Sequence, residues 1–400
     1  MTAARLQEGP SLNDFDTLGL APTLRDALAR AGFSAPTPIQ AQAIPPAMEG
    51  RDILGLAQTG TGKTLAFGLP LIHHLLAAPG RPAPKTAKAL ILAPTRELVN
   101  QIAESLRAFT AGTPLRVATV VGGQSIGRQI ALLSRGVDIL VATPGRLIDL
   151  MDRGAVDLRA TRELVLDEAD QMLDLGFIHA LRRIAPKLGT PRRTMLFSAT
   201  MPKQMEELSR AYLSDPIRVQ VAPPGVAAER IDQSVEFLDR AEKPARLREI
   251  ISADQDALTL VFARTKHGAE KLMKSLVADG FNAASIHGNK SQSQRDRAIR
   301  AFRDGSVTVL VATDVAARGI DIPGVAHVVN YELPDAPDSY VHRIGRTARA
   351  GREGAAISLC SPEEADQLRQ IQKLMKIEIP ATRGEPPAAL RAAEAGRGAG

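Results

Sequence analysis

The stretch Ala57-Gln58-Thr59-Gly60-Thr61-Gly62-Lys63-Thr64 follows a short apolar run, Ile53–Leu56, and opens into a further apolar segment. This order predicts a buried strand, a glycine-rich turn and a helix. The glycines allow positive φ, so successive N–H groups can form a cradle for phosphates. Lys63 would reach the β- and γ-phosphates, and the Thr64 hydroxyl would bind Mg²⁺. The general pattern has glycine where this chain has Ala57, so a plain glycine-rich turn stays an alternative at this point.

The composition is that of a globular protein with a weak preference for an anionic partner. Apolar residues make up 44% of the 400 residues and charged residues 24%, and this length predicts two or three domains. Fifty lysines and arginines against 44 aspartates and glutamates favour a polyanion, although a solvated basic face would produce the same excess. The single cysteine, Cys360, excludes an internal disulfide and a cysteine-rich zinc site.

The N-terminus has no apolar core of signal-peptide length, and we find no apolar span of about 18 residues. We therefore expect no membrane partner and a cytoplasmic location.

Apolar runs alternate with helical patterns along the chain, which predicts parallel, doubly wound α/β domains. The runs are continuous, as in a sheet that is buried on both faces. They lie at 53–56, 89–94, 117–121, 138–142, 163–166 and 194–197, and then at 234–237, 258–262, 283–286, 307–311, 325–329 and 355–360.

A segment of small residues with two prolines and a glycine interrupts this alternation and predicts a linker. The predicted organisation is a flexible arm at 1–14, a first domain at 15–220, the linker at 221–229, a second domain at 230–380 and a disordered tail at 381–400.

Three acids follow the apolar run 163–166, as Asp167-Glu168-Ala169-Asp170. They fall at the carboxyl end of a strand, which is the edge where open α/β sheets bind ligands. Asp167 is placed to bind the metal through water, and Glu168 to orient and deprotonate the attacking water. Carboxylates at an ordinary helix N-terminus are the alternative, but the upstream phosphate-binding stretch in the same domain argues against it.

These acids, the 57–64 stretch and the turn Phe33-Ser34-Ala35-Pro36-Thr37-Pro38-Ile39-Gln40 resemble the DEAD-box ATP-dependent RNA helicases. The resemblance extends from about Phe15 to Leu374, and the bacterial RhlE-type branch is the nearest in organisation. That family uses alanine at the position of Ala57. The resemblance implies two tandem RecA-like domains, each a mostly parallel sheet with helices on both faces.

The resemblance implies roles for residues around ATP and Mg²⁺. Those expected to bind ATP are Phe15, Phe33, Gln40, Thr59, Gly60, Thr61, Gly62, Lys63, Thr64 and Asp314. Thr64 and Asp167 would hold the metal, and the expected catalytic residues are Lys63, Asp167, Glu168 and the arginine fingers Arg346 and Arg349. Ser198, Thr200, Asp170 and His342 would couple hydrolysis to strand separation. The family usually has glycine where this chain has Ala348, which puts only the local backbone conformation in doubt.

RNA contacts are implied in both domains at turns that follow strands, where hydroxyls and backbone amides can bind phosphates without reading bases. They are Thr95, Arg96, Gly123, Thr143, Pro144, Gly145 and Arg146 in the first domain, and Arg264, His287, Gly288, Gln292, Arg295 and Thr313 in the second.

The function that follows is RNA-stimulated ATP hydrolysis coupled to local, non-processive RNA unwinding or remodelling, with closure of the two domains around ATP completing the site. The partner would be single- or double-stranded RNA, recognised through its backbone and largely without regard to sequence, and candidate protein partners are ribosome-assembly or RNA-decay proteins. Two alternatives are weighed. Gln40 and Asp170 argue against a translocating DNA helicase. Intact Lys63, Glu168, Arg346 and Arg349 argue against an ATP-gated RNA clamp or scaffold with little turnover.

Overall fold

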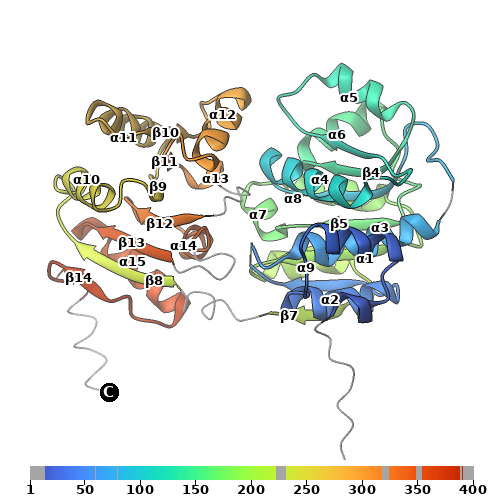
Figure 1. The fold of residues 1–400 in the computed structure, drawn as a ribbon, viewed down its shortest axis with the longest axis horizontal. Helices are drawn as coiled ribbons and strands as arrows, with labels where there is room; N and C mark the ends of the chain where they lie inside the picture. The colour runs from blue at the N-terminus through green and yellow to red at the C-terminus, as the bar shows by residue number, and fades with distance from the viewer. Residues whose placement is uncertain are drawn as a thin grey trace, which may run out of the picture. The chain divides into compact units, whose positions relative to one another are not determined.

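The computed structural model describes residues 14–58, 60–78, 80–221, 231–317, 324–347, 354–387 and 390 of the chain (Figure 1). It divides into two compact units, Met1–Val221 and Ala222–Gly400, each of which is considered separately below. The division falls at the segment predicted as a linker, although residues 222–229 lie outside the described part.

The first unit contains a seven-stranded parallel sheet in the order β3-β4-β2-β5-β6-β1-β7. Its strands are β1 Ile53–Leu56, β2 Ala87–Leu92, β3 Val117–Val120, β4 Val137–Ala142, β5 Glu163–Leu166, β6 Arg193–Ser198 and β7 Ile217–Gln220. The helices are η1 Phe15–Leu18, α1 Pro22–Arg30, α2 Pro38–Met48, α3 Lys63–Ala77, α4 Arg96–Thr110, α5 Ile126–Leu133, α6 Pro144–Asp152, α7 Ala169–Asp174, α8 Ile178–Ile184, η2 Ala185–Lys187 and α9 Lys203–Tyr212.

Successive strand residues in this unit enter different cores, because side chains alternate across a sheet. In β2, Ile91 packs with residues of α1 to α4, whereas Leu90 and Leu92 pack with residues of α6 to α9. Both faces of the sheet are therefore covered by helices, which is why the strands are continuously apolar.

The second unit repeats this arrangement with a seven-stranded parallel sheet in the order β10-β11-β9-β12-β13-β8-β14. Its strands are β8 Ile231–Phe237, β9 Leu258–Phe262, β10 Ala283–Ile286, β11 Val309–Ala312, β12 Val325–Asn330, β13 Gly354–Cys360 and β14 Ala381–Arg383. The helices are α10 Lys243–Ala253, α11 Lys266–Ala278, α12 Gln292–Arg303, α13 Asp314–Ala317, α14 Pro337–Ile344, η4 Pro362–Glu364 and α15 Ala365–Met375. The two strand orders are identical position by position, so β8 in the second unit corresponds to β1 in the first. The predicted fold class is confirmed.

Two edge strands, β7 and β14, were not predicted. In β7 only Val219 is buried, and all of β14 is exposed, so neither has the apolar run that marks the inner strands. The prediction of a disordered tail at 381–400 was wrong for Ala381–Arg383, since this segment pairs with β8 through main-chain hydrogen bonding.

Among the described residues, none of the helices has the length and apolar character needed to cross a membrane.

Asp52, which directly precedes β1, forms hydrogen bonds to the segments that lead into or belong to the neighbouring strands β6 and β7. Its carboxylate, 8% exposed, accepts hydrogen bonds from the backbone N–H groups of Thr194 and Ser214, both at 2.7 Å. Of the two N–H donors, Thr194 lies in β6 and Ser214 lies three residues before β7, so this one side chain links β1 to both of its neighbours in the sheet.

Asp52→Asn should lower the free energy of unfolding by about 1–3 kcal/mol, because an amide offers only one oxygen to these two N–H groups. Urea denaturation would measure the change. The matched control is Asp215→Asn, which alters a carboxylate that is 94% exposed and paired with Arg51 at the surface; its effect should stay within about 0.5 kcal/mol. Equal effects of the two substitutions would contradict the role of Asp52.

Candidate functional site

The predicted phosphate-binding stretch forms a turn between β1 and α3. Gly60 and Gly62 have φ of +86° and +94°, a left-handed conformation that glycine adopts without strain. A Cβ atom on Gly62 would lie 2.6 Å from Gln40 Nε2 and 2.8 Å from Thr37 Oγ1. Glycine is therefore required here both by the backbone and by the close approach of α2. Thr59 lies outside the described residues.

Gln40 braces this turn from the first turn of α2. Its Oε1 accepts from the Thr37 N–H at 2.9 Å, and its Nε2 donates to the Gly62 carbonyl at 3.0 Å. The Thr37 hydroxyl donates to the Thr61 carbonyl at 2.8 Å. Gln40 is 2% exposed, so its amide holds the loop in this structure, and contact with adenine stays a prediction. Sequence reasoning missed Thr37, which the capping-box spacing to Gln40 could have identified.

The two aromatic residues predicted to bind ATP differ in their surroundings. Phe33 is 44% exposed, with its ring 6.3 Å from that of Phe109, so part of the ring is open to a ligand. Phe15 is 4% exposed and packs in the first core cluster. Phe15 would therefore act on a ligand through its neighbours rather than by direct contact.

Lys63 and Asp167 meet beneath the loop. Lys63 Nζ donates to the Ala57 carbonyl at 3.2 Å and lies 3.7 Å from Asp167 Oδ1. Both side chains are nearly fully buried. Burial raises the pKa of Asp167 to about 6, against the opposing effect of the Lys63 charge. Thr64, one residue beyond Lys63, is half-buried.

Glu168 follows in a left-handed conformation with φ of +51°, which is uncommon for a residue other than glycine. Its N–H donates to Asp167 Oδ1 at 3.0 Å, and the side chain is 2% exposed. This backbone conformation turns the chain from β5 into α7, so that Asp167 and Glu168 both stay at the carboxyl edge of the sheet.

Asp170 connects the acidic motif to the segment after β6. Its Oδ2 accepts from the N–H of Ala199 at 3.0 Å and from the N–H and hydroxyl of Thr200 at 2.8 and 3.0 Å. The Ser198 hydroxyl in turn donates to the Thr200 carbonyl at 2.7 Å. The structure thus brings together Asp170, Ser198 and Thr200, the first-unit residues predicted to couple hydrolysis to strand separation.

The residues predicted to bind RNA in the first unit gather after β2, β3 and β4. The Arg96 guanidinium lies over Gly123, where a Cβ would be 2.1 Å from Arg96 Nη1. Arg146 Nη1 donates to the Gln124 carbonyl at 3.1 Å. Thr95 and Thr143 precede α4 and α6, and Pro144 and Gly145 form the first turn of α6. These residues form one cluster on adjacent strand ends.

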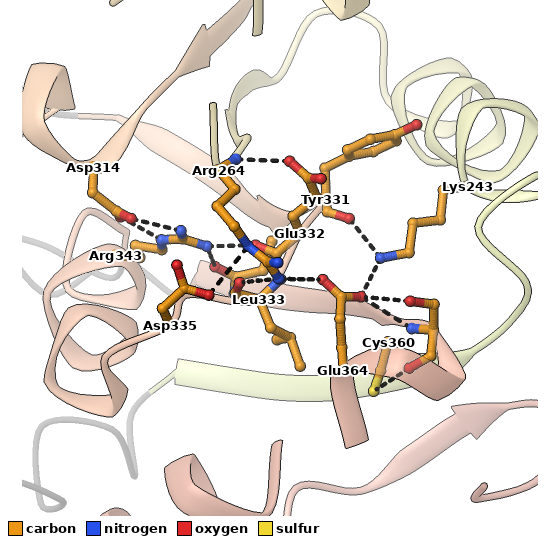
Figure 2. A network of polar contacts seen from close by, with 12 residues as sticks. Lys243, Arg264, Asp314, Tyr331, Glu332, Leu333, Asp335, Arg343, Cys360 and Glu364 are labelled. Atoms are coloured by element: carbon orange, nitrogen blue, oxygen red, sulfur yellow. Dashed lines mark hydrogen bonds and ion pairs between the residues drawn. The ribbon is translucent and has the colours of Figure 1, made fainter. Parts of the chain in front are cut away.

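In the second unit, Asp314 is held by an arginine that sequence reasoning missed. Arg343 is 1% exposed, and its Nε and Nη2 donate to the two Asp314 carboxylate oxygens at 2.5 and 2.8 Å. Its Nη1 donates to Asn330 Oδ1 at 3.0 Å and to the Glu332 carbonyl at 2.7 Å (Figure 2). Arg343 lies between His342 and Arg346 in the sequence, so its place in that basic segment was the available signal.

A small pocket beside Arg343 brings Asp314, His342 and Arg346 together. Arg346 is 4% exposed, and its Nε donates to the His342 carbonyl at 3.2 Å. In this structure the guanidinium therefore lies within its own unit. Arg349, the other predicted finger, lies outside the described residues.

The remaining predicted RNA contacts have partners inside the second unit. Arg264 donates to the Leu333 carbonyl and to Glu364 Oε1, both at 3.1 Å (Figure 2). Arg295 donates to the Ala316 carbonyl at 3.3 Å, which places it against the turn of α13 that begins after Thr313. Gln292 Nε2 donates to Asp296 Oδ1 at 2.9 Å.

His287 is 4% exposed and uses both ring nitrogens within the unit. Nε2 lies 3.0 Å from Glu270 Oε2, and Nδ1 is 3.3 Å from the Asn289 N–H. The hydrogen bond from His287, followed by those from Ser285 and Lys290, lowers the pKa of Glu270 to about 2. His287 thus orients the turn that carries Gly288, and direct contact with RNA stays a prediction.

Comparison with known proteins identifies the family. Residues 37–208 match the model of the DEAD/DEAH box helicases, and residues 242–351 match that of the helicase conserved C-terminal domain. The chain is 43% identical to the ATP-dependent RNA helicase CshA of Limosilactobacillus reuteri, with 91% of this chain and 72% of that protein covered. It is also 43% identical to the ATP-dependent RNA helicase DBP2 of Meyerozyma guilliermondii, with 95% and 69% covered.

Comparison with solved structures supports the same family. Saccharomyces cerevisiae Dbp5 bound to RNA and ADP BeF3 matches with a TM-score of 0.82 and 32% identity, covering 93% of this chain and 96% of that one. Mss116p bound to ssRNA and AMP-PNP matches with a TM-score of 0.84 and 29% identity, covering 96% and 82%. The order of motifs along the two sheets, the phosphate-binding turn braced by Gln40 and the length of these matches lead to one conclusion: the chain belongs to the DEAD-box helicase family.

Proposed function

We propose that this protein is an ATP-dependent RNA helicase that couples RNA-stimulated ATP hydrolysis to local, non-processive separation or remodelling of RNA duplexes. The observation that carries the proposal is the meeting of Lys63, Asp167 and Glu168 at the carboxyl ends of β1 and β5, beneath the glycine turn. This is the arrangement that phosphoryl transfer to water requires, with a cation at the phosphates and a carboxylate beside the attacking water.

The first unit supplies the groups that bind and cleave ATP. The N–H groups of the 60–64 turn and Lys63 bind the phosphates, and Glu168 accepts the proton of the attacking water. Thr64 and Asp167 fit Mg²⁺, because they offer hard oxygen donors and because a cation would stabilise the charged form of the buried Asp167 carboxyl. When bound, the metal would neutralise charge on the β- and γ-phosphates.

Asp170 would transmit a conformational change at the hydrolysis site to the segment 198–200. A shift of α7 after the γ-phosphate leaves would move Asp170, and with it the three hydrogen bonds to Ala199 and Thr200. Such a displacement of a hydrogen-bonded segment is a local change that nucleotide state can bias.

The second unit would contribute Asp314 at the ribose and Arg346 and Arg349 at the γ-phosphate. The bidentate contact from Arg343 fixes the Asp314 carboxylate in position. Binding of ATP and RNA would be cooperative if both ligands favour the same closed arrangement of the units. The clusters around Arg96 and Arg295 would bind the RNA backbone, so recognition would depend little on base sequence.

Three finer assignments are part of the proposal and rest on the sequence. These are membership of the RhlE-type bacterial branch, a cytoplasmic location, and protein partners from ribosome assembly or RNA decay.

ATP hydrolysis should rise strongly with single-stranded RNA and much less with DNA of the same sequence, because contacts to 2′-hydroxyls distinguish the two. Steady-state phosphate release at saturating ATP would measure the rates. Equal stimulation by both nucleic acids would overturn the assignment to RNA, and hydrolysis without any stimulation would remove the coupling.

Glu168→Gln should lower the turnover of ATP by about 10²–10⁴-fold, because the amide cannot accept the proton of water. ATP and RNA should still bind, and the complex should persist. Phosphate release and RNA retention on a filter would be measured together. Glu206→Gln on α9, an exposed position, serves as the control. Turnover near that of the unmodified protein would show that Glu168 is not the base.

The concentration of Mg²⁺ that half-saturates ATP hydrolysis should increase as the pH falls below about 6. The ligand-free Asp167 carboxyl, whose pKa is raised to about 6, then carries a proton that the cation must displace. Above this pH the carboxyl is already charged, so the requirement should level off. The comparison of pH 5.5, 6.5 and 7.5 needs the Mg²⁺ affinity of free ATP as a correction. A corrected value that does not change would contradict the raised pKa.

A further inference from the structure

The second unit has a cavity at the position that the phosphate-binding turn occupies in the first unit. Because the two strand orders are identical, the segment after β8 corresponds to the 57–64 turn after β1. The first helical residue is a lysine in both units, Lys63 in α3 and Lys243 in α10. Both lysines are nearly fully buried and reach residues that follow other strands of the same parallel sheet.

Lys243 is held by two partners. Its Nζ donates to the Tyr331 carbonyl, after β12, at 2.9 Å, and to Glu364 Oε2, after β13 (Figure 2). An ammonium group has three N–H donors, so two are satisfied by partners among the described residues. Lys243 is 2% exposed, and a buried donor needs a partner. Lys243 also lines the cavity, where its third N–H would be the donor to a ligand.

The cavity has a volume of about 410 Å³, which is within the range of small-molecule sites. Four cationic side chains line it: Arg240, Lys243, Arg264 and Lys271. Arg240 and Lys271 are exposed, and the structure shows no hydrogen bond or ion pair for either among the residues it describes. Both are thus free to turn towards an anion that enters.

Three glutamates also line the cavity, but two of them are already engaged. Glu364 accepts from Arg264, Lys243 and the N–H groups of Leu333 and Ser361. Glu332 Oε2 accepts from the Arg264 N–H at 2.7 Å. Glu363 is exposed. The four cationic side chains outnumber the three carboxylates, so the net charge of the cavity lining is positive.

The segment after β8 cannot bind a triphosphate as the first unit does. It contains no glycine between Leu238 and Lys243, and the Asp239 N–H is already bonded to Glu242 Oε2 at 2.7 Å. The backbone cradle is therefore missing, and the positive charge comes from side chains. Arginine and lysine side chains bind a phosphate group through charge-assisted hydrogen bonds and need no backbone cradle.

We propose that this cavity binds a small phosphomonoester, with its phosphate between Arg240, Lys243 and Lys271. The site is separate from the groups assigned to ATP hydrolysis, so it is a second ligand site on the same chain.

The test uses the full chain, ribose 5-phosphate as the ligand and ribose as its neutral counterpart, with binding measured by calorimetry. The unmodified protein should bind ribose 5-phosphate with a dissociation constant of about 1 mM or below and should not bind ribose. Arg240→Glu combined with Lys271→Glu should weaken binding of ribose 5-phosphate by about tenfold or more. Arg248→Glu combined with Lys274→Glu, which reverses two surface charges on α10 and α11 that do not line the cavity, should leave it unchanged.

Equal binding by both double variants, or no binding by the unmodified protein, would overturn the proposal. RNA is the other source of phosphate. The Arg240/Lys271 variant could lose affinity for RNA while its binding of ribose 5-phosphate stays unchanged. That result would assign the cavity to RNA and would also overturn the proposal. RNA-stimulated ATP hydrolysis by the Arg240/Lys271 variant should match that of the unmodified protein. This assay separates the fate of the cavity from that of the helicase assignment.

Discussion

Parallel strand pairing is the constraint on which every site in this molecule depends. When all strands of a sheet run in the same direction, their carboxyl ends meet at one edge, and the turns that follow them become neighbours. Lys63 and Asp167 are 104 residues apart in the chain, yet they meet because β1 and β5 both flank β6. The link from Asp170 to Thr200 follows in the same way from the adjacency of β5 and β6.

Because these turns lie together at the sheet edge, the first unit buries several carboxyl groups there. Asp167, Glu168 and Asp170 are each at most 5% exposed, and burial disfavours a charged carboxyl. Asp170 offsets that cost with hydrogen bonds to backbone and hydroxyl donors, whereas Asp167 has the more distant Lys63 and one N–H. Asp167 is thus the less well satisfied carboxyl, and a bound cation would relieve it. A site that is incomplete without its ligand is what a nucleotide-dependent switch requires.

The sequence was sufficient to predict the inner strands, because most of their residues are apolar; 53–56 and 163–166 match β1 and β5 residue for residue. It could not predict β7 or β14, whose sheet position comes from pairing with neighbours rather than from burial. Motif order located the site residues but not their contacts. Three of these contacts depend on a partner elsewhere in the sequence. Gln40 bonds to the Gly62 carbonyl, His287 lies against Glu270, and Phe15 packs in the first core cluster.

The two units show how one topology supports different chemistry. In the first, Gly60 and Gly62 adopt positive φ, and the turn passes close to Thr37 and Gln40 at the start of α2. In the second, the segment from Leu238 to Lys243 has no glycine and closes on itself through Asp239 and Glu242. Lys243 corresponds in position to Lys63, but its carboxylate partner Glu364 lies closer than Asp167 lies to Lys63. The ammonium group of Lys243 is thus neutralised within the second unit by Glu364, and the cavity beside it is lined by further cationic side chains.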